Sequence, residues 1–132
     1  SGYVNAIYLD DFDQIENESW FFGRIKRQDA EFILKSDSNR TGSFLIRMCN
    51  GQNTNHIYSL SLRSEQKEIR HYKIMREMST SNDQIKSCYF IYYSNSQQIK
   101  RFKSLNDLIS YYKINKSGLS TTLTSVCSRE VV

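Results

Sequence analysis

The sequence predicts an α+β domain in which a central antiparallel β-sheet is flanked by two α-helices. Three observations lead to this prediction. Two segments carry apolar residues at the spacing of an amphipathic helix, one before and one after the rest of the pattern. Four segments between them are short and apolar, alternating, or rich in aromatic and β-branched residues. The connections between these segments have hairpin length, which is typical of antiparallel neighbours.

The two predicted helices have recognisable starts. The first is predicted over Gln28–Lys35, and Arg27 opens it on the side of its apolar stripe. The second is predicted to begin after Ser104, because Ser104–Asp107 resembles a capping box with Asp in place of the usual Glu or Gln. Its apolar residues follow at the spacing of one helix face: Leu105, Leu108, Ile109 and Tyr112.

Four strands are predicted between the helices. In chain order they are Ser43–Met48, Ile57–Arg63, Ile69–Met75 and Cys88–Tyr93. The first is apolar on both faces, which is typical of a strand buried on two sides. The polar segments between strands and before the second helix are predicted to be loops: Asn50–Asn55, Ser79–Lys86 and Ser94–Arg101.

The second and third strands are predicted to carry polar side chains on one face. Ser59 and Ser61 share a face of the second strand, and Ile57 is expected on that face too. His71 and Lys73 share a face of the third strand. The opposite faces carry Tyr58, Leu60 and Leu62 on the second strand, and Arg70, Tyr72 and Ile74 on the third.

Charge is distributed unevenly along the chain. Residues 1–18 contain five acids and no Lys or Arg, whereas the chain from Ser19 onward contains 18 basic and nine acidic residues, a net charge of +9. A basic domain favours an anionic partner, such as phosphate on a protein, a nucleic acid or a lipid. The aromatic residues stand at packing spacings, so we expect no nucleic-acid partner. No run of eighteen apolar residues exists, so we expect no direct membrane insertion.

No motif for a metal, a cofactor or catalysis is found in the sequence. The cysteines Cys49, Cys88 and Cys127 lack CxxC spacing and are expected to be free thiols. A glycine-rich phosphate loop and the HRD, DFG and HExxH motifs are absent. We therefore expect a monomeric binding module that has no catalytic activity and needs no cofactor or metal.

Arg47 gives the strongest indication of a binding site. A guanidinium inside a buried strand is costly unless a counter-charge compensates it, and the flanking strand residues supply no acid. Its rigid fork of donors suits the oxygens of a phosphate. The residues alone leave open a structural ion pair, or a side chain that extends to solvent. Arg27, His71 and Lys73 can complete a positive pocket that suits a dianionic phosphate.

The order of several motifs resembles that of a Src-homology-2 (SH2) domain. The motifs are residues 20–25 (WFFGRI), 42–47 (GSFLIR), 71–74 (HYKI), 102–112 and 118–123. Three of these stretches are most similar to those of Src-type cytoplasmic, non-receptor tyrosine kinases: WFFG at residues 20–23, GSFLIR at 42–47 and SGL at 117–119. The resemblance implies an SH2 domain over residues 19–128, after an acidic linker at 1–18 and before a following linker at 129–132. Within the first linker, Gly2–Val4 and Tyr8 resemble the last strand of a Src-homology-3 domain.

The resemblance implies a phosphotyrosine site formed by Arg27, Arg47, Cys49, His71 and Lys73. Arg47 would grip the phosphate, Arg27 would add a second grip over the aromatic ring, and His71 and Lys73 would line the pocket. Backbone N–H groups of Asn50–Asn53 would complete the phosphate cradle. The family commonly has a hydroxyl where Cys49 stands, and its loss would weaken binding by about 0.5–1.5 kcal/mol.

The resemblance also implies a second, apolar pocket for the third residue after phosphotyrosine. Its predicted residues are Tyr72, Ile91, Tyr92 and Leu119. Tyr72 would divide the two pockets, and an aliphatic third residue is expected. Tyr92 is bulky and begins the adjoining loop, so a peptide redirected into a turn, with Asn selected at the second place, remains an alternative.

These features predict a module that recruits its parent protein to tyrosine-phosphorylated partners. By the same resemblance the parent is a Src-type tyrosine kinase of the cytoplasm, which its partners recruit to the inner face of the plasma membrane. The alternative is a degenerate SH2 domain, in which Cys49 and the two long loops Ser79–Lys86 and Ser94–Arg101 weaken or alter phosphopeptide binding.

Overall fold

The computed structural model describes residues 14–49, 56–93 and 99–130. The predictions for the Asn50–Asn53 cradle and for the Src-homology-3 strand at Gly2–Tyr8 lie outside the described residues. In chain order the elements are α2 (Arg27–Leu34), β1 (Phe44–Met48), β2 (His56–Arg63), the 3-10 helix η1 (Glu65–Lys67), β3 (Ile69–Ser81), β4 (Gln84–Ile91) and α3 (Leu105–Ile114).

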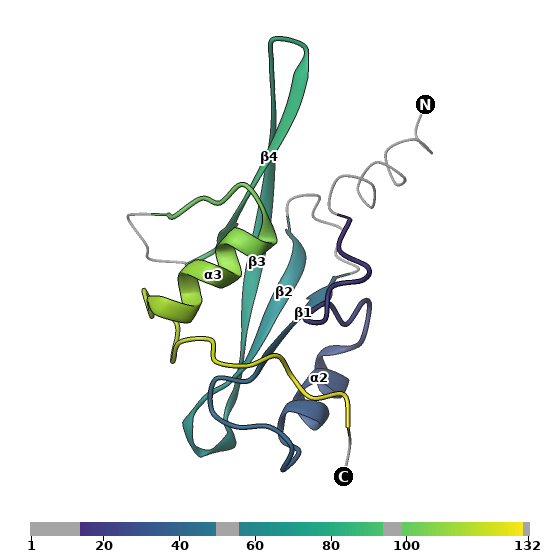
Figure 1. Cartoon of the computed structure of the whole chain (residues 1–132), viewed down its shortest axis with the longest axis vertical. Coiled ribbons are helices and arrows are strands. Elements are labelled where there is room, and N and C mark those ends of the chain that lie inside the picture. Colours follow the sequence, from purple (N-terminus) through teal and green to yellow (C-terminus); the bar gives the residue numbers. More distant parts are fainter. Residues whose placement is uncertain (1–13, 50–55, 94–98, 131–132) are drawn as a thin grey trace.

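The four strands form one antiparallel sheet in the order β1-β2-β3-β4. In Figure 1, α3 lies against the half of the sheet that contains β3, and α2 lies near the β1 edge. The predicted fold class, an antiparallel sheet flanked by two α-helices, is therefore confirmed.

Two apolar clusters hold the helices on the sheet. The main cluster joins α3 to strand residues that include Phe44, Ile46 and Leu60. A smaller cluster joins Ala30 and Leu34 of α2 to Leu45 of β1. Because successive strand residues point to opposite faces, Arg47 follows Leu45 onto the α2 side of the sheet. The strand pattern thus directs a charged side chain toward α2.

Side-chain hydrogen bonds stabilise the start of α3 and the end of α2. The Ser104 hydroxyl accepts a hydrogen bond from the Asp107 N–H at 3.0 Å, which confirms the predicted cap of α3. At the other helix, the buried Arg63 of β2 donates from one terminal nitrogen to the carbonyl oxygens of Leu34 and Ser36, both at 2.9 Å. Arg63 therefore ties the C-terminal end of α2 to the sheet and satisfies the Leu34 carbonyl, which the helix leaves free.

The prediction of a loop over Ser79–Lys86 is wrong. Strand β3 continues to Ser81 and β4 begins at Gln84, so only Asn82 and Asp83 form the turn. Both have positive φ, 53° and 62°, as a two-residue hairpin turn requires. Figure 1 shows this hairpin as a long arm beyond the helices. Its residues are exposed on both faces, so the apolar alternation that marks a strand is missing.

The prediction that Ile57 shares the serine face of β2 is also wrong. Ile57 belongs to the main cluster, together with Tyr58 and Leu60. The pairing of β2 with β3 shifts register between His56 and Tyr58, and this irregularity interrupts the simple alternation of side chains.

Substituting Gly42 by Ala should destabilise the fold by about 2–4 kcal/mol. Gly42 has φ +93°, and an added Cβ would lie 2.4 Å from Thr124 Oγ1 and 2.5 Å from its Cγ2. Urea denaturation of Gly42→Ala and of the double variant with Thr124→Ala measures the two contributions. The second substitution removes both nearest atoms and should restore part of the stability. A loss below about 0.5 kcal/mol, the scale of an ordinary surface change, would contradict this account.

Candidate functional site

The sheet register gathers polar side chains on the face that α2 covers. Arg47 of β1 is opposite Ser59 of β2, which is opposite Lys73 of β3. In the next row, Ser61 is opposite His71. Three of the predicted phosphotyrosine-site residues therefore occupy neighbouring positions on one face, although they come from two separate strands.

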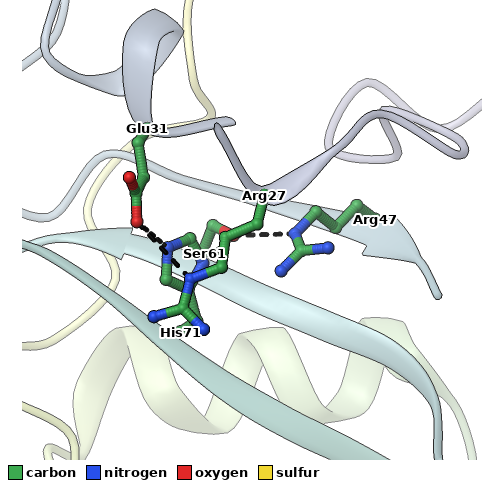
Figure 2. Close-up of polar contacts among 5 residues, drawn as sticks. All are labelled: Arg27, Glu31, Arg47, Ser61 and His71. Carbon is green, nitrogen blue, oxygen red and sulfur yellow. Dashed lines mark hydrogen bonds and ion pairs between the residues drawn. The ribbon is translucent and has the colours of Figure 1, made fainter. Parts of the chain in front are cut away.

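Helix α2 places two more charged groups over this face. Arg27 and Glu31 lie one helical turn apart, and Arg27 Nε is 3.5 Å from Glu31 Oε2. The same carboxylate oxygen is 2.8 Å from His71 Nε2 (Figure 2). The Arg27 side chain keeps 68% of its exposure, so its guanidinium stands at the open side of the site.

A continuous set of hydrogen bonds links Arg47 to Glu31. Arg47 Nε donates to Ser61 Oγ at 3.3 Å, and Ser61 Oγ is 2.8 Å from His71 Nδ1 (Figure 2). A neutral imidazole with its proton on Nε2 satisfies every contact, because Nε2–H donates to Glu31 while Nδ1 accepts from the Ser61 hydroxyl. The imidazole of His71 then fixes the orientation of both the Ser61 hydroxyl and the Glu31 carboxylate.

The site's electrostatics favour the neutral form of His71. Burial is the main cause that lowers the pKa of His71, the Glu31 hydrogen bond opposes it, and the charges of Arg27 and Arg47 lower it further. The hydrogen bond from His71 is in turn the main cause that lowers the pKa of Glu31. The carboxylate is therefore ionised at neutral pH, while the imidazole, whose side chain is 7% exposed, is neutral.

Arg47 is half-buried and, within the described ranges, forms no ion pair with a carboxylate. Burial is the main cause that lowers its pKa, and the positive charge of Arg27 acts in the same direction, although Cys49 and Glu31 oppose them. Even so lowered, the group remains a cation at neutral pH. The positive charges of Arg47 and Arg27 repel each other. An anion bound between them would offset this repulsion and stabilise the site.

Cys49 and His56 complete the wall of the site beside Lys73. Cys49 Sγ lies 2.9 Å from Ser59 Oγ, and His56 Nε2 lies 3.3 Å from the same oxygen. Burial lowers the pKa of His56, and the charges of Lys73 and Arg47 lower it further. Cys49, a predicted member of the phosphotyrosine site, therefore lies next to the Arg47 row, and its sulfur is already in contact with a hydroxyl.

Three of the residues predicted for the second pocket, Tyr72, Ile91 and Leu119, lie on the other side of the sheet. The Tyr72 side chain packs against the main cluster, and its hydroxyl accepts from the Ser120 N–H at 2.9 Å. Ile91 and Leu119 are buried in that cluster, with 1% and 2% exposure, whereas Tyr92 is 48% exposed. Tyr72 and His71, adjacent on β3, thus belong to different sides, and the role of each in peptide binding stays a prediction.

Sequence reasoning missed two members of this site. Glu31 could have been found, because it stands four residues after Arg27 and therefore on the same side of the helix. His56 gave no usable signal, because the irregular pairing at the start of β2 breaks the alternation from which its direction would be inferred.

Comparisons with known proteins agree with this geometry. Residues 20–112 match the family model of the SH2 domain. The chain is 37% identical over 131 residues to the tyrosine-protein kinases Fgr of Rattus norvegicus and Mus musculus, which covers 96% of this chain and 23% of each kinase. A solved structure of CED-2 superposes with a TM-score of 0.69 at 21% identity, over 92% of this chain and 66% of that one. This last likeness concerns the fold.

The chain belongs to the SH2 domain family, whose members are binding modules for phosphotyrosine peptides. Its similarity to a Src-family kinase confirms the predicted resemblance. The chain spans less than a quarter of the length of those kinases. Among the described residues, neither helix has the length and apolar character that crossing a bilayer requires. The same residues contain no group of three or more His, Cys, Asp or Glu side chains suited to a metal.

The free energy of unfolding should decrease as the pH falls below about 6.5, the ordinary pKa of histidine. Both His56 and His71 have lowered pKa values in the folded state, so the unfolded chain takes up protons first. Each proton taken up contributes a slope of up to about 1.4 kcal/mol per pH unit. Urea denaturation between about pH 7.5 and 5.5 measures it, and His71→Gln should flatten the slope. Unchanged stability over this range would contradict the assignment.

Proposed function

We propose that the site binds the phosphate of a phosphotyrosine peptide between Arg47 and Arg27. The observation that carries this proposal is the half-buried Arg47, which within the described residues has a serine hydroxyl as partner and no carboxylate. Arg47 offers its two terminal nitrogens to a bidentate anion, because its Nε is already bonded to Ser61. Arg27, on the exposed side of the site, closes over the ligand from α2.

The other predicted residues support this role. Lys73 stands two positions along the same row as Arg47 and would lie beside the tyrosine ring. His71 acts as a positioning residue, because it holds Ser61 on one side and Glu31 on the other. Cys49 shares its contact with Ser59, and a thiol is a weak donor to phosphate.

The depth of Arg47 supports selection of phosphotyrosine over phosphoserine. Arg47 is half-buried on β1, whereas the Arg27 side chain stands near it at the exposed edge of the site (Figure 2), so we expect a phosphate to pass Arg27 before it reaches Arg47. A tyrosine side chain extends its phosphate several ångströms further than a serine side chain does. Only the longer side chain is expected to place the phosphate between the two guanidiniums without moving the peptide backbone into the site.

Within a longer parent protein, this module would recruit that protein to tyrosine-phosphorylated partners. The identity to Fgr supports a Src-type tyrosine kinase as the parent. We place the SH2 domain at residues 19–128, between linkers at 1–18 and 129–132. We also propose a cytoplasmic location, with recruitment to the inner face of the plasma membrane through phosphorylated partners.

A degenerate domain with weak or altered binding is the second candidate, and Cys49 is the observation that favours it. Its sulfur stands where family members commonly have a hydroxyl that bonds the phosphate. The contact of Cys49 with Ser59, which stands opposite Arg47 and also contacts His56, supports a place for Cys49 in the site. Lack of phosphopeptide binding by a folded chain would support this candidate.

Arg47→Ala should weaken binding of a phosphotyrosine peptide at least about 30-fold, because losing one partner of a buried charge pair costs about 2–5 kcal/mol. Arg70→Ala is the matched control, since Arg70 is an exposed arginine of β3 that pairs with Glu68 at 2.7 Å. Calorimetric titration with phosphotyrosine, unphosphorylated and phosphoserine versions of one peptide measures both effects. Equal affinity for the first two peptides would exclude the proposed function.

Glu31→Gln should strengthen phosphopeptide binding by about threefold, because it removes a negative charge near the phosphate while its amide oxygen still accepts from His71. The gain should shrink at high salt. Glu68→Gln, which removes an exposed charge paired with Arg70, is the control. Weaker binding by Glu31→Gln would contradict this prediction, because the positioning of Arg27 by the carboxylate would then outweigh the repulsion between Glu31 and the phosphate.

A further inference from the structure

Tyr93 emerges from β4 on the side of the sheet that faces α3. The Tyr92 N–H still donates to the Lys73 carbonyl at 3.0 Å, so the chain follows β3 to this point. Ile91 points into the main cluster and Tyr92 is exposed. By the alternation of an extended chain, Tyr93 returns to the side of Ile91, and its ring packs against the main cluster.

The ring of Tyr93 lies against the backbone of the loop that follows α3. An added Cβ at Gly118 would be only 3.2 Å from Tyr93 Cζ, so the ring approaches as closely as a glycine allows. The Tyr93 hydroxyl donates to the Ser117 carbonyl at 3.3 Å. The hydroxyl end of the ring is thus held by the backbone of Gly118 and by the Ser117 carbonyl, in the loop that also carries the buried Leu119.

Three further tyrosines surround this position. Burial raises the pKa of Tyr93, with the neighbouring Tyr112, Tyr72 and Tyr111 adding to the effect, so the ring is neutral at neutral pH. The loop itself is fixed from two sides, because the Tyr72 hydroxyl accepts from the Ser120 N–H and the Tyr111 hydroxyl is 3.0 Å from Ser117 Oγ. Tyr93 therefore fills a built space between β3, α3 and this loop.

We propose that Tyr93 is a specificity-determining residue that fills the second peptide pocket from within the chain. This inference rests on the proposed function and on the second pocket that the family resemblance implies at Tyr72, Ile91 and Leu119. With the Tyr93 ring in place, the third residue after phosphotyrosine contacts the surface of that ring. The buried side chains of Ile91 and Leu119 then stay covered. The domain then discriminates little at that place and selects mainly through the phosphate and the residues that follow it directly.

The test compares two peptides that differ only at the third place, pTyr-Ala-Ala-Ile and pTyr-Ala-Ala-Ala. The wild-type chain should bind them within about threefold of each other, because no apolar pocket is open to the isoleucine. Tyr93→Ala should prefer the isoleucine peptide by about tenfold, the scale of burying one aliphatic side chain. Tyr93→Phe keeps the ring and should behave as the wild type. Circular dichroism verifies folding, and Tyr93→Val replaces the alanine variant if the latter unfolds.

A tenfold preference for isoleucine in the wild type would overturn the inference, because the ring would then move aside for the peptide. An unchanged preference in folded Tyr93→Ala would overturn it as well. A measurement that needs no phosphopeptide tests the inference on Tyr93 separately from the proposed function. In an NMR titration with isobutanol, the methyl signals of Ile91 and Leu119 should shift in Tyr93→Ala and not in the wild type. Shifts in both chains, or in neither, would overturn the inference even if no phosphopeptide binds.

Discussion

The constraint on which this structure depends is the incompletely compensated charge of Arg47. Two arginines stand on the α2 side of the sheet, and their partners differ. Arg63 donates to the carbonyls of Leu34 and Ser36, so its guanidinium is bonded at the C-terminal end of α2. Arg47 has a serine hydroxyl as its partner within the described ranges, and a second guanidinium as its neighbour. The cost of holding that charge is tolerated when an anion arrives to offset it.

The scaffold around Arg47 orients its neighbours. Arg63 fixes one end of α2, and Glu31 fixes the same helix to β3 through His71. Arg27 is consequently held over the sheet by a carboxylate it shares with the histidine. This sharing keeps the exposed guanidinium close to the site in the absence of ligand, so less conformational entropy is lost when a phosphate binds.

Sequence patterns predict the fold where a core imposes regular periodicity, and they fail where solvent surrounds the chain and at the irregular pairing beside the buried Ile57. Helix α3 and the apolar strand β1 were recognisable because burial fixes the spacing of their residues. The arm of β3 and β4 departs from the predicted loop because polar residues on both faces hide the alternation of a strand. Arg47 is predicted from its place in an apolar strand, and Arg27 from its place at the start of the first helix. Glu31 follows Arg27 by one helical turn, whereas Tyr93 acquires its role only from contacts with a segment distant in sequence.

Strand β3 connects the two halves of the proposed recognition surface. His71 and Tyr72 are adjacent, so their side chains reach opposite faces, one toward Glu31 and the other toward Ser120. The phosphate contributes binding free energy that is independent of the peptide's sequence, so selectivity has to come from the Tyr72 side. If Tyr93 covers that side, the exposed ring of Tyr92 is the large surface left near the peptide's path. Selection would then fall on residues close to the phosphotyrosine, because those are the ones that reach Tyr72 and Tyr92.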